Sequence, residues 1–413
     1  MAVDAPEVLD SLLSAPEYLQ DPYPVYARLR TSDPVHWCAP WGQWVVTRHE
    51  DVAAILRQPD LLSSSGWEER FLGQLPPESV DELPTVMAHY RTKVVSNTDP
   101  PEHTRLREII SRSFTPRVVA ALREPVSALV DEMLDELAGE EKADLIARFA
   151  YPLPATVIAL LLGAPAEDRH LFEQWSYDIV SFVGTGSPDL ELARREEASL
   201  ARFRSYLDEL IERRRRDPRD DLLSLLISRS DDGAGLTHDE LVSTCITLLF
   251  AGHETTANLI GNLMLALLRH PDQWRRLAEE PELARTAVEE ALRYDSPVQR
   301  VRRVARRDFE LGGRRIRQGE LVMGFLGAAN RDPAVFDDPD RFDVTRKANN
   351  HTAFGGGVHF CLGAALSRLE GPLAVNALVQ RFPWMRLPDD AAVRFRPNMT
   401  FRGLDALIVE LAP

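Results

Sequence analysis

The sequence has few cysteines and no excess of positive charge. Its three cysteines, Cys38, Cys245 and Cys361, lie far apart in the 413-residue chain, whereas a disulfide-rich secreted domain would carry many at close spacing. The net charge of −16 would repel nucleic acid and anionic lipid. The acidic start MAVDAPEVLD also lacks the basic and apolar regions of a signal peptide. We therefore expect a cytoplasmic protein that binds no nucleic acid.

Long apolar runs are nearly absent as well. The one stretch long enough to cross a bilayer is 245–268, and it contains His253, Glu254, Asn258 and Asn262. Such groups are costly in lipid. This stretch is better interpreted as a buried helix than as a membrane span.

Helical periodicity dominates what is present. Apolar residues make up 44% of the chain and charged residues 27%, the proportions of a globular protein with a large core. Length alone favours roughly two or three domains, although no Ser/Gly/Pro-rich linker divides the chain. The periodicity predicts helices over 22–31, 49–57, 104–138, 152–162, 166–183, 189–215, 238–268, 271–295 and 362–381.

Strand patterns are short and few. Residues 34–47 read as a hairpin, residues 308–327 as strands separated by Gly-Gly and Gln-Gly turns, and residues 394–412 as a final hairpin. Two long stretches, 63–101 and 330–357, read as loops, and loops of that length are usually functional or disordered.

One cysteine lies where a glycine-rich loop leads into a helix. A lone cysteine is more often a small core residue than a reactive centre, but the three glycines at 355–357 and Gly363 allow a flat ligand to approach the backbone near Cys361. The start of the following helix would stabilise a thiolate. His359 is too close in sequence to share a tetrahedral zinc ion with Cys361, and an iron–sulfur cluster would need more thiolates.

This stretch resembles a known signature. The order Phe354, Gly355, Gly357, His359, Cys361, Leu362, Gly363 is similar to the haem-binding pattern F-G-x-G-x-H-x-C-L-G of the cytochrome P-450 family. The resemblance implies haem b as cofactor, with Phe354, Gly355 and Gly363 beside it and the Cys361 thiolate as the axial iron ligand. In that family the thiolate donates electron density that favours O–O cleavage.

A second motif lies in the expected helix 238–268. Ala251 to Thr256 read A-G-H-E-T-T, which resembles the A/G-G-x-D/E-T-T segment of the same family. The resemblance implies that Ala251 and Gly252 leave room for O2 and that Glu254 and Thr255 relay protons. The alternative for Thr255 is a hydroxyl that bonds back to its own helix.

Glu290 and Arg293 match the family's E-x-x-R, and Arg341 in DPDRF resembles the third member of its buried structural network. By themselves, Glu290 and Arg293 could form only a surface ion pair, because they are three residues apart on one helix. The resemblance instead implies that the three residues form a scaffold and take no part in the chemistry.

Haem propionates need cationic or donor groups. The segment DPPEHTRLR resembles the family segment in which His103 and Arg107 reach a propionate. Arg303 and His359 match the other two positions, and the neighbouring Arg302 stays open as an alternative to Arg303.

The resemblance also implies where a substrate lies. The family's cavity walls correspond here to apolar positions, so an apolar small organic molecule is expected. The positions we assign to this pocket are Leu248, Ala251, Val298 and Phe401.

The resemblance extends from DPYPVYARLR near the start to the C-terminal hairpin. It implies a single domain over 1–413, mainly α with a small β-rich lobe, in which helices form a triangular prism around the haem. Since no residues remain for a fused redox module, electrons should come from NAD(P)H through a separate ferredoxin reductase and ferredoxin. Candidate docking residues for the ferredoxin are Arg112, Lys347 and Arg368, which could equally be ordinary solvated residues.

We therefore expect a soluble, monomeric haem-thiolate monooxygenase. It would hydroxylate or epoxidise an apolar substrate in natural-product, steroid, terpene or fatty-acid metabolism. The alternatives are a peroxide-driven peroxygenase, which typically lacks the acid–alcohol pair, and a non-catalytic helper of the same fold, which often lacks the cysteine.

Overall fold

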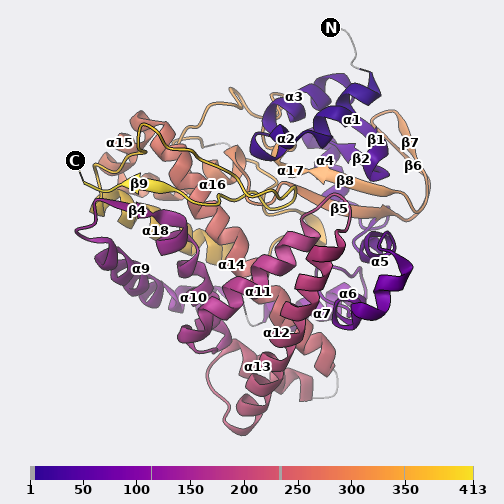
Figure 1. The fold of residues 1–413 in the computed structure, drawn as a ribbon, viewed down its shortest axis with the longest axis horizontal. Coiled ribbons are helices and arrows are strands. Elements are labelled where there is room, and N and C mark those ends of the chain that lie inside the picture. Colours follow the sequence, from indigo (N-terminus) through magenta and orange to yellow (C-terminus); the bar gives the residue numbers. More distant parts are fainter. Residues whose placement is uncertain (1–4, 113, 232–234, 348, 413) are drawn as a thin grey trace. The chain divides into compact units, whose positions relative to one another are not determined.

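The chain divides into two compact units, each built from separate stretches of sequence. Figure 1 shows the helices and strands of the chain, coloured along the sequence. The structure, a computed structural model, describes residues 5–112, 114–231, 235–347 and 349–412. Unit 1 comprises Met1–Ser63, Arg123–Ala150 and Thr255–Pro413, and unit 2 comprises Ser64–Leu122 and Tyr151–Glu254. Helix α14 (His238–Arg269) contributes residues to both units. The single domain expected from the sequence stays a prediction.

Unit 1 has a helical part in which α18 packs closely against α16. A Cβ on Gly371 of α18 would lie 3.0 Å from Val288 Cγ2 of α16, so glycine permits the close approach of the two helices. The helices of this unit, besides the C-terminal part of α14, are α1 (Pro6–Ser14), α2 (Pro16–Gln20), α3 (Tyr23–Ser32), α4 (His49–Arg57), α9 (Arg123–Leu137), α15 (Pro271–Glu279), α16 (Ala284–Tyr294), α17 (Leu326–Ala329) and α18 (Ala364–Arg381).

Unit 1 also carries the strands. The largest sheet has the order β1-β2-β8-β5-β3. In it β2 pairs with β8 in parallel and the other neighbours pair antiparallel. Its strands are β1 (Val35–Cys38), β2 (Gln43–Val46), β3 (Leu62–Ser63), β5 (Arg300–Ala305) and β8 (Leu321–Phe325). Two smaller sheets pair β4 (Lys142–Asp144) with β9 (Ile408–Glu410) and β6 (Phe309–Leu311) with β7 (Arg314–Ile316).

Unit 2 is built mainly from helices, and aromatic side chains join two of them. Phe172 and Trp175 of α11 contact Phe203 of α12, with ring centroids 5.9 and 4.8 Å apart. Besides the N-terminal part of α14, its helices are α5 (Trp67–Leu72), α6 (Pro84–Arg91), α7 (Glu102–Ser111), α8 (Pro116–Ala121), α10 (Pro152–Leu162), α11 (Arg169–Val183), α12 (Leu190–Arg216) and α13 (Leu222–Asp231).

The predicted fold class is confirmed, since helices dominate and the sheets are small. The expected helices over 22–31, 49–57, 152–162, 189–215, 238–268 and 362–381 agree with the structure to within two residues. The helix expected over 166–183 begins as a 3-10 turn and continues as α11. The hairpin at 34–47 is confirmed as β1 and β2, with Gly42 in the left-handed conformation at φ 61°.

Two expected helices are wrong as single elements, and proline explains one break in each. The region 104–138 divides into α7, α8 and α9, because Thr115 caps a new helix whose first residue is Pro116. The region 271–295 divides into α15 and α16, because Pro281 lacks the N–H that a continuous helix requires.

Two other expectations also need correction. The stretch 63–101 holds α5, a 3-10 segment (Pro77–Glu82) and α6, so it is only partly a loop. Within the tail, Phe395 pairs with Leu404 in an isolated bridge, but the tail's strand β9 pairs with the distant β4, so the expected hairpin is not formed by two strands of the tail. Among the described residues, no helix combines the length and the apolar character that a membrane crossing requires.

Candidate functional site: a cysteine loop and an acid–alcohol helix

The three cysteines lie in different environments. Cys38 and Cys245 are fully buried, and burial raises the pKa of each thiol to about 12. Both therefore stay protonated and inaccessible at neutral pH. Cys361 is only partly buried. Of the three, it is the thiol that can reach a ligand.

Backbone hydrogen bonds close the loop that carries Cys361. The Cys361 N–H donates to the Phe354 carbonyl at 2.9 Å, and the Phe360 N–H donates to the Gly357 carbonyl at 3.2 Å. Helix α18 begins at Ala364, three residues after the thiol. The sulfur therefore lies near the positive end of a helix dipole, where a thiolate is stabilised.

Glycines shape this loop. Gly355 and Gly357 have φ values of 69° and 61°, which side chains rarely tolerate. A Cβ on Gly357 would also lie 2.5 Å from the Leu56 carbonyl oxygen. A Cβ on Gly363 would lie 3.9 Å from the Cys361 sulfur, so glycine there keeps the surroundings of the thiol open.

This donor set fits a haem better than a bare metal ion. Within the described ranges, no three His, Cys, Asp or Glu side chains cluster as a metal site would require. Haem iron can take a single cysteine thiolate from the protein. One accessible thiol in a glycine-lined loop meets that requirement.

The second motif lies on helix α14, and its residues differ in their exposure to solvent. Ala251 is exposed in the middle of the helix, whereas His253 and Glu254 are fully buried. Gly252 lies against α10, where a Cβ would come within 3.0 Å of Ile158 Cδ1. The exposed face at Ala251 can admit a small molecule, and the acid lies inside the protein.

The buried acid has a partner that the sequence motifs did not indicate. The Tyr151 hydroxyl donates a hydrogen bond to Glu254 Oε2. The Tyr151 ring also contacts the His253 ring edge to face, with centroids 4.4 Å apart. No local pattern could have paired residues 103 positions apart.

The other half of the motif belongs to unit 1. Thr255 is partly buried on α14, and the next residue, Thr256, places its hydroxyl 3.3 Å from the Ser367 hydroxyl of α18. The helix that follows the Cys361 loop therefore contacts α14 one residue beyond Thr255.

The candidate propionate ligands lie in both units. In unit 2, His103 is buried and Arg107 partly buried on α7, four residues apart on one helical face. Burial, and then the Arg107 guanidinium, lower the pKa of His103, so the ring is neutral at pH 7. In unit 1, Arg303 is buried on β5 and His359 lies in the cysteine loop. Their convergence on one group stays a prediction.

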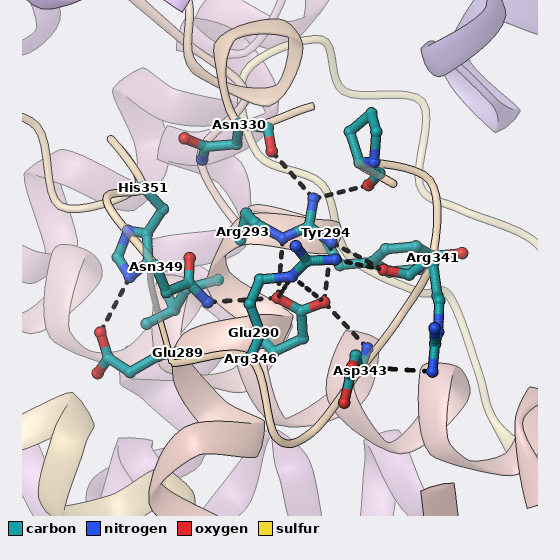
Figure 2. Close-up of polar contacts among 12 residues, drawn as sticks. Glu289, Glu290, Arg293, Tyr294, Asn330, Arg341, Asp343, Arg346, Asn349 and His351 are labelled. Atoms are coloured by element: carbon teal, nitrogen blue, oxygen red, sulfur yellow. Dashed lines mark hydrogen bonds and ion pairs between the residues drawn. The ribbon is translucent and has the colours of Figure 1, made fainter. Parts of the chain in front are cut away.

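Figure 2 shows the network around Glu290, which is fully buried in unit 1. Arg293 binds it through Nε and Nη2, both at 2.8 Å. Asn349 Nδ2 donates to it at 3.3 Å and the Asp343 N–H at 3.0 Å. This carboxylate is enclosed by donors, which supports the expected scaffolding role of Glu290 and Arg293.

The third member of the network is Arg346, and the prediction of Arg341 is wrong. Arg346 Nε lies 3.2 Å from Glu290 Oε1, and its side chain is 13% exposed. The Arg341 side chain is 64% exposed, and its Nη2 atom lies 3.8 Å from Asp343 Oδ2. Its carbonyl accepts from Arg293 Nη2 at 3.0 Å, so Arg341 takes part through its backbone (Figure 2).

The candidate docking residues differ in their surroundings. Arg112 and Lys347 are exposed. Arg368 is 42% exposed and binds Glu289 through two nitrogens, at 2.7 and 2.9 Å. Its guanidinium also lies 4.5 Å from the centre of the Phe354 ring. Arg368 therefore supports the cysteine loop in addition to any docking role.

Two of the expected pocket residues are neighbours. Val298 and Phe401 form an isolated antiparallel bridge in unit 1, so their side chains lie on one surface. Leu248 and Ala251 are three positions apart on α14 in unit 2. The four residues thus form two pairs, one in each unit, and a common pocket stays a prediction.

Comparison with known proteins is consistent with these features. The family model described as Cytochrome P450 matches residues 69–402. The vitamin D(3) 25-hydroxylase of Pseudonocardia autotrophica is 42% identical, over 96% of this chain and 95% of its own length. The biotin biosynthesis cytochrome P450 of Bacillus subtilis (strain 168) is 39% identical, over 97% of this chain and 98% of its own length. A crystal structure of P450BioI with an acyl carrier protein ligated to hexadec-9Z-enoic acid has a TM-score of 0.87 and 38% identity, over 96% of this chain and 100% of that one.

Proposed function

Because the chain belongs to the cytochrome P450 family of haem-thiolate monooxygenases, we propose that it hydroxylates or epoxidises a small apolar biosynthetic intermediate. Haem b, when bound, activates O2 for insertion of one oxygen atom into the substrate. The protein's own residues hold the cofactor, move protons and orient the substrate.

The observation that carries the proposal is the environment of Cys361. This thiol is partly exposed, lies three residues before α18 and belongs to a loop that contains Gly355 and Gly357, whereas the other two cysteines are buried thiols. Cys361 is therefore our choice for the axial ligand. His103, Arg107, Arg303 and His359 are our choices for the propionate contacts.

Proton delivery is assigned to Glu254 and Thr255, which are consecutive on α14. A buried carboxyl can hold a proton and pass it to a neighbouring hydroxyl. The presence of this pair with Cys361 favours an O2-dependent monooxygenase over a peroxygenase or a non-catalytic helper.

The substrate is proposed from the apolar pocket positions and from the relatives. Val298 and Phe401 offer apolar contacts on one surface. The similar proteins include a vitamin D(3) hydroxylase and an enzyme solved with a carrier-bound fatty acid. We propose a sterol-like or acyl substrate with few polar groups.

Electrons are proposed to come from NAD(P)H through a ferredoxin reductase and a ferredoxin. The chain is strongly acidic overall, so docking of an acidic ferredoxin needs local positive charge. Arg112, Lys347 and Arg368 are the candidates. We also propose a cytoplasmic, monomeric enzyme.

The difference spectrum of the dithionite-reduced protein with carbon monoxide tests the assignment. We expect the strongly red-shifted Soret band of thiolate-ligated haem, its loss in Cys361→Ser and its retention in the control Cys245→Ala. Retention of the band in Cys361→Ser would overturn the choice of ligand. A band typical of histidine ligation in the wild type would overturn the monooxygenase proposal.

A further inference from the structure

Glu254 is held by a residue that lies far away in the sequence. Its side chain is fully buried on α14, and the Tyr151 hydroxyl donates to its Oε2 atom. Tyr151 immediately precedes α10 and is partly exposed. The contact therefore joins the start of one helix to the acid in the middle of another, within unit 2.

One ring contact and the packing of α10 against α14 determine where the phenol lies. The edge-to-face contact of its ring with His253 has an interplanar angle of 80°. Gly252 precedes His253 on α14, and because it has no side chain it lets α14 approach Ile158 of α10. Because α10 contacts α14 beside the acid, the position of the Tyr151 hydroxyl relative to Glu254 is set by helix packing.

The Tyr151 hydroxyl is a neutral donor, and this affects how strongly the Glu254 carboxyl group holds a proton. A phenol is neutral and donates one hydrogen bond, which stabilises the ionised carboxyl group by less than a guanidinium would. It also fixes one of the two carboxyl oxygens in space. A carboxyl group held in this way has a defined orientation and can still take up a proton.

We propose that Tyr151 is a positioning residue for proton delivery: its hydroxyl fixes the orientation and the proton affinity of the Glu254 carboxyl. The inference rests on the proposed function, in which Glu254 supplies protons. It adds a residue outside the recognised motifs and assigns His253 the role of support for the phenol ring.

The first test is Tyr151→Phe, which keeps the ring and its contact with His253 and removes only the hydroxyl. In the holoenzyme with NAD(P)H, ferredoxin reductase, ferredoxin and a screened substrate, we expect the rate of product formation to fall by roughly tenfold, less than for loss of the acid itself. Hydrogen peroxide should rise correspondingly. The carbon monoxide spectrum and the substrate KM should stay unchanged, because Tyr151 acts through Glu254.

The second readout needs no turnover. Infrared difference spectra between the wild type and Glu254→Gln isolate the carboxyl band of Glu254, and its titration should move to higher pH in Tyr151→Phe, because a donor to the ionised form is lost. A ring-fluorinated tyrosine at position 151 has a more acidic hydroxyl and should move the titration to lower pH. If Tyr151→Phe does not fold, the shift of the Glu254 titration in the fluorinated protein is the test.

Tyr206→Phe is the matched control. The Tyr206 hydroxyl donates to Asp168 Oδ2 at 2.7 Å elsewhere in unit 2, so this variant removes an equivalent bond. It should leave coupling and the Glu254 titration unchanged.

The outcomes separate the two proposals. If Glu254→Gln impairs coupling and Tyr151→Phe changes neither coupling nor the carboxyl titration, the inference about Tyr151 is overturned and the proposed function stands. If Glu254→Gln itself has normal coupling, the assignment of Glu254 fails and the role of Tyr151 fails with it. A loss in Tyr206→Phe equal to that in Tyr151→Phe would also overturn the inference.

Discussion

Glu290 and Glu254 are both fully buried carboxyl groups, and each accepts a hydrogen bond from a different kind of donor. Glu290 accepts hydrogen bonds from Arg293 and Arg346, which are charged donors, and also from an amide and a backbone N–H. Glu254 accepts from the neutral hydroxyl of Tyr151. Both groups are equally removed from solvent, so exposure does not distinguish them.

The difference suits the roles proposed for the two acids, which are a scaffold for Glu290 and proton delivery for Glu254. Guanidinium groups stay charged at any working pH and bind a carboxylate in a fixed geometry. A carboxylate surrounded by them holds chain segments together, here α16 and the loop at 341–349 (Figure 2). A carboxyl held by a phenol can exchange protons. We therefore expect substitutions of Glu290 to affect stability and substitutions of Glu254 to affect turnover.

The largest expected effect is that of Glu290→Gln. This change leaves Arg293 and Arg346 charged and without their shared carboxylate, and breaking a buried ion pair typically costs about 3–5 kcal/mol of unfolding free energy. Urea denaturation of the purified holoprotein measures the loss, and the yield of haem-bound protein should fall with it. A stable Glu290→Gln protein with a selective loss of coupling would reverse the comparison.

Glu254→Gln should give the opposite result. Because a glutamine amide oxygen can still accept the hydrogen bond from the Tyr151 hydroxyl, the free energy of unfolding should change by no more than about 1 kcal/mol. Product formation per NAD(P)H should fall by roughly 100-fold, the contribution typical of a general acid. Urea denaturation midpoints test the small change in stability, and the ratio of product to NAD(P)H consumed tests the loss of coupling. A variant that loses stability without losing coupling would assign Glu254 to the scaffold.

Arg346→Ala and Arg341→Ala sharpen the comparison within the network. Arg346 contacts Glu290 directly, so its loss should cost about 2–3 kcal/mol, less than the loss of the shared acid. Arg341 is exposed, and its contribution to the network is a carbonyl that the substitution keeps. Its removal should cost no more than about 0.5 kcal/mol. Equal losses in the two variants, measured by urea denaturation, would restore Arg341 as the third member.

The error at Arg341 shows what the sequence can and cannot provide. The motif located the loop that closes over Glu290, but Arg341 and Arg346 both lie in that loop. Which of them turns inward depends on the loop's backbone, including Asp338, which has φ 43°. A motif read along the chain contains no information about that turn.

Tyr151 illustrates a second limit. Helix periodicity predicted α10 and α14 nearly to the residue, because apolar spacing is a local property. The hydrogen bond between Tyr151 and Glu254 depends on how the two helices pack, and that register is set by contacts such as Gly252 against Ile158. The recognisable motifs therefore pointed to Glu254 and Thr255 as candidates, whereas the contact of Tyr151 with Glu254 could be found only in the structure.

The smallest expected effect concerns a third kind of carboxylate partner, a histidine whose charge depends on pH. Buried His36 lies between two acids in unit 1, with Nε2 2.8 Å from Asp10 and Nδ1 3.0 Å from Asp33. Arg314 also faces Asp33, at 3.0 Å. Burial lowers the pKa of His36, but hydrogen bonds to the two carboxylates outweigh it and raise the pKa above 6.5.

The sign of the pH dependence follows from this shift. A folded-state pKa above the unfolded value means that the folded protein binds the proton more tightly, so the stabilisation is complete below pH 6.5 and is lost as the pH rises through the folded pKa. In His36→Gln, urea denaturation should show a penalty that is larger at low pH by up to about 1 kcal/mol, the scale of a partly screened ion pair. A guanidinium group keeps its charge at any working pH, so the cost of Glu290→Gln should stay constant over the same pH interval. If the two penalties changed with pH in parallel, the distinction between fixed and titratable partners would not hold.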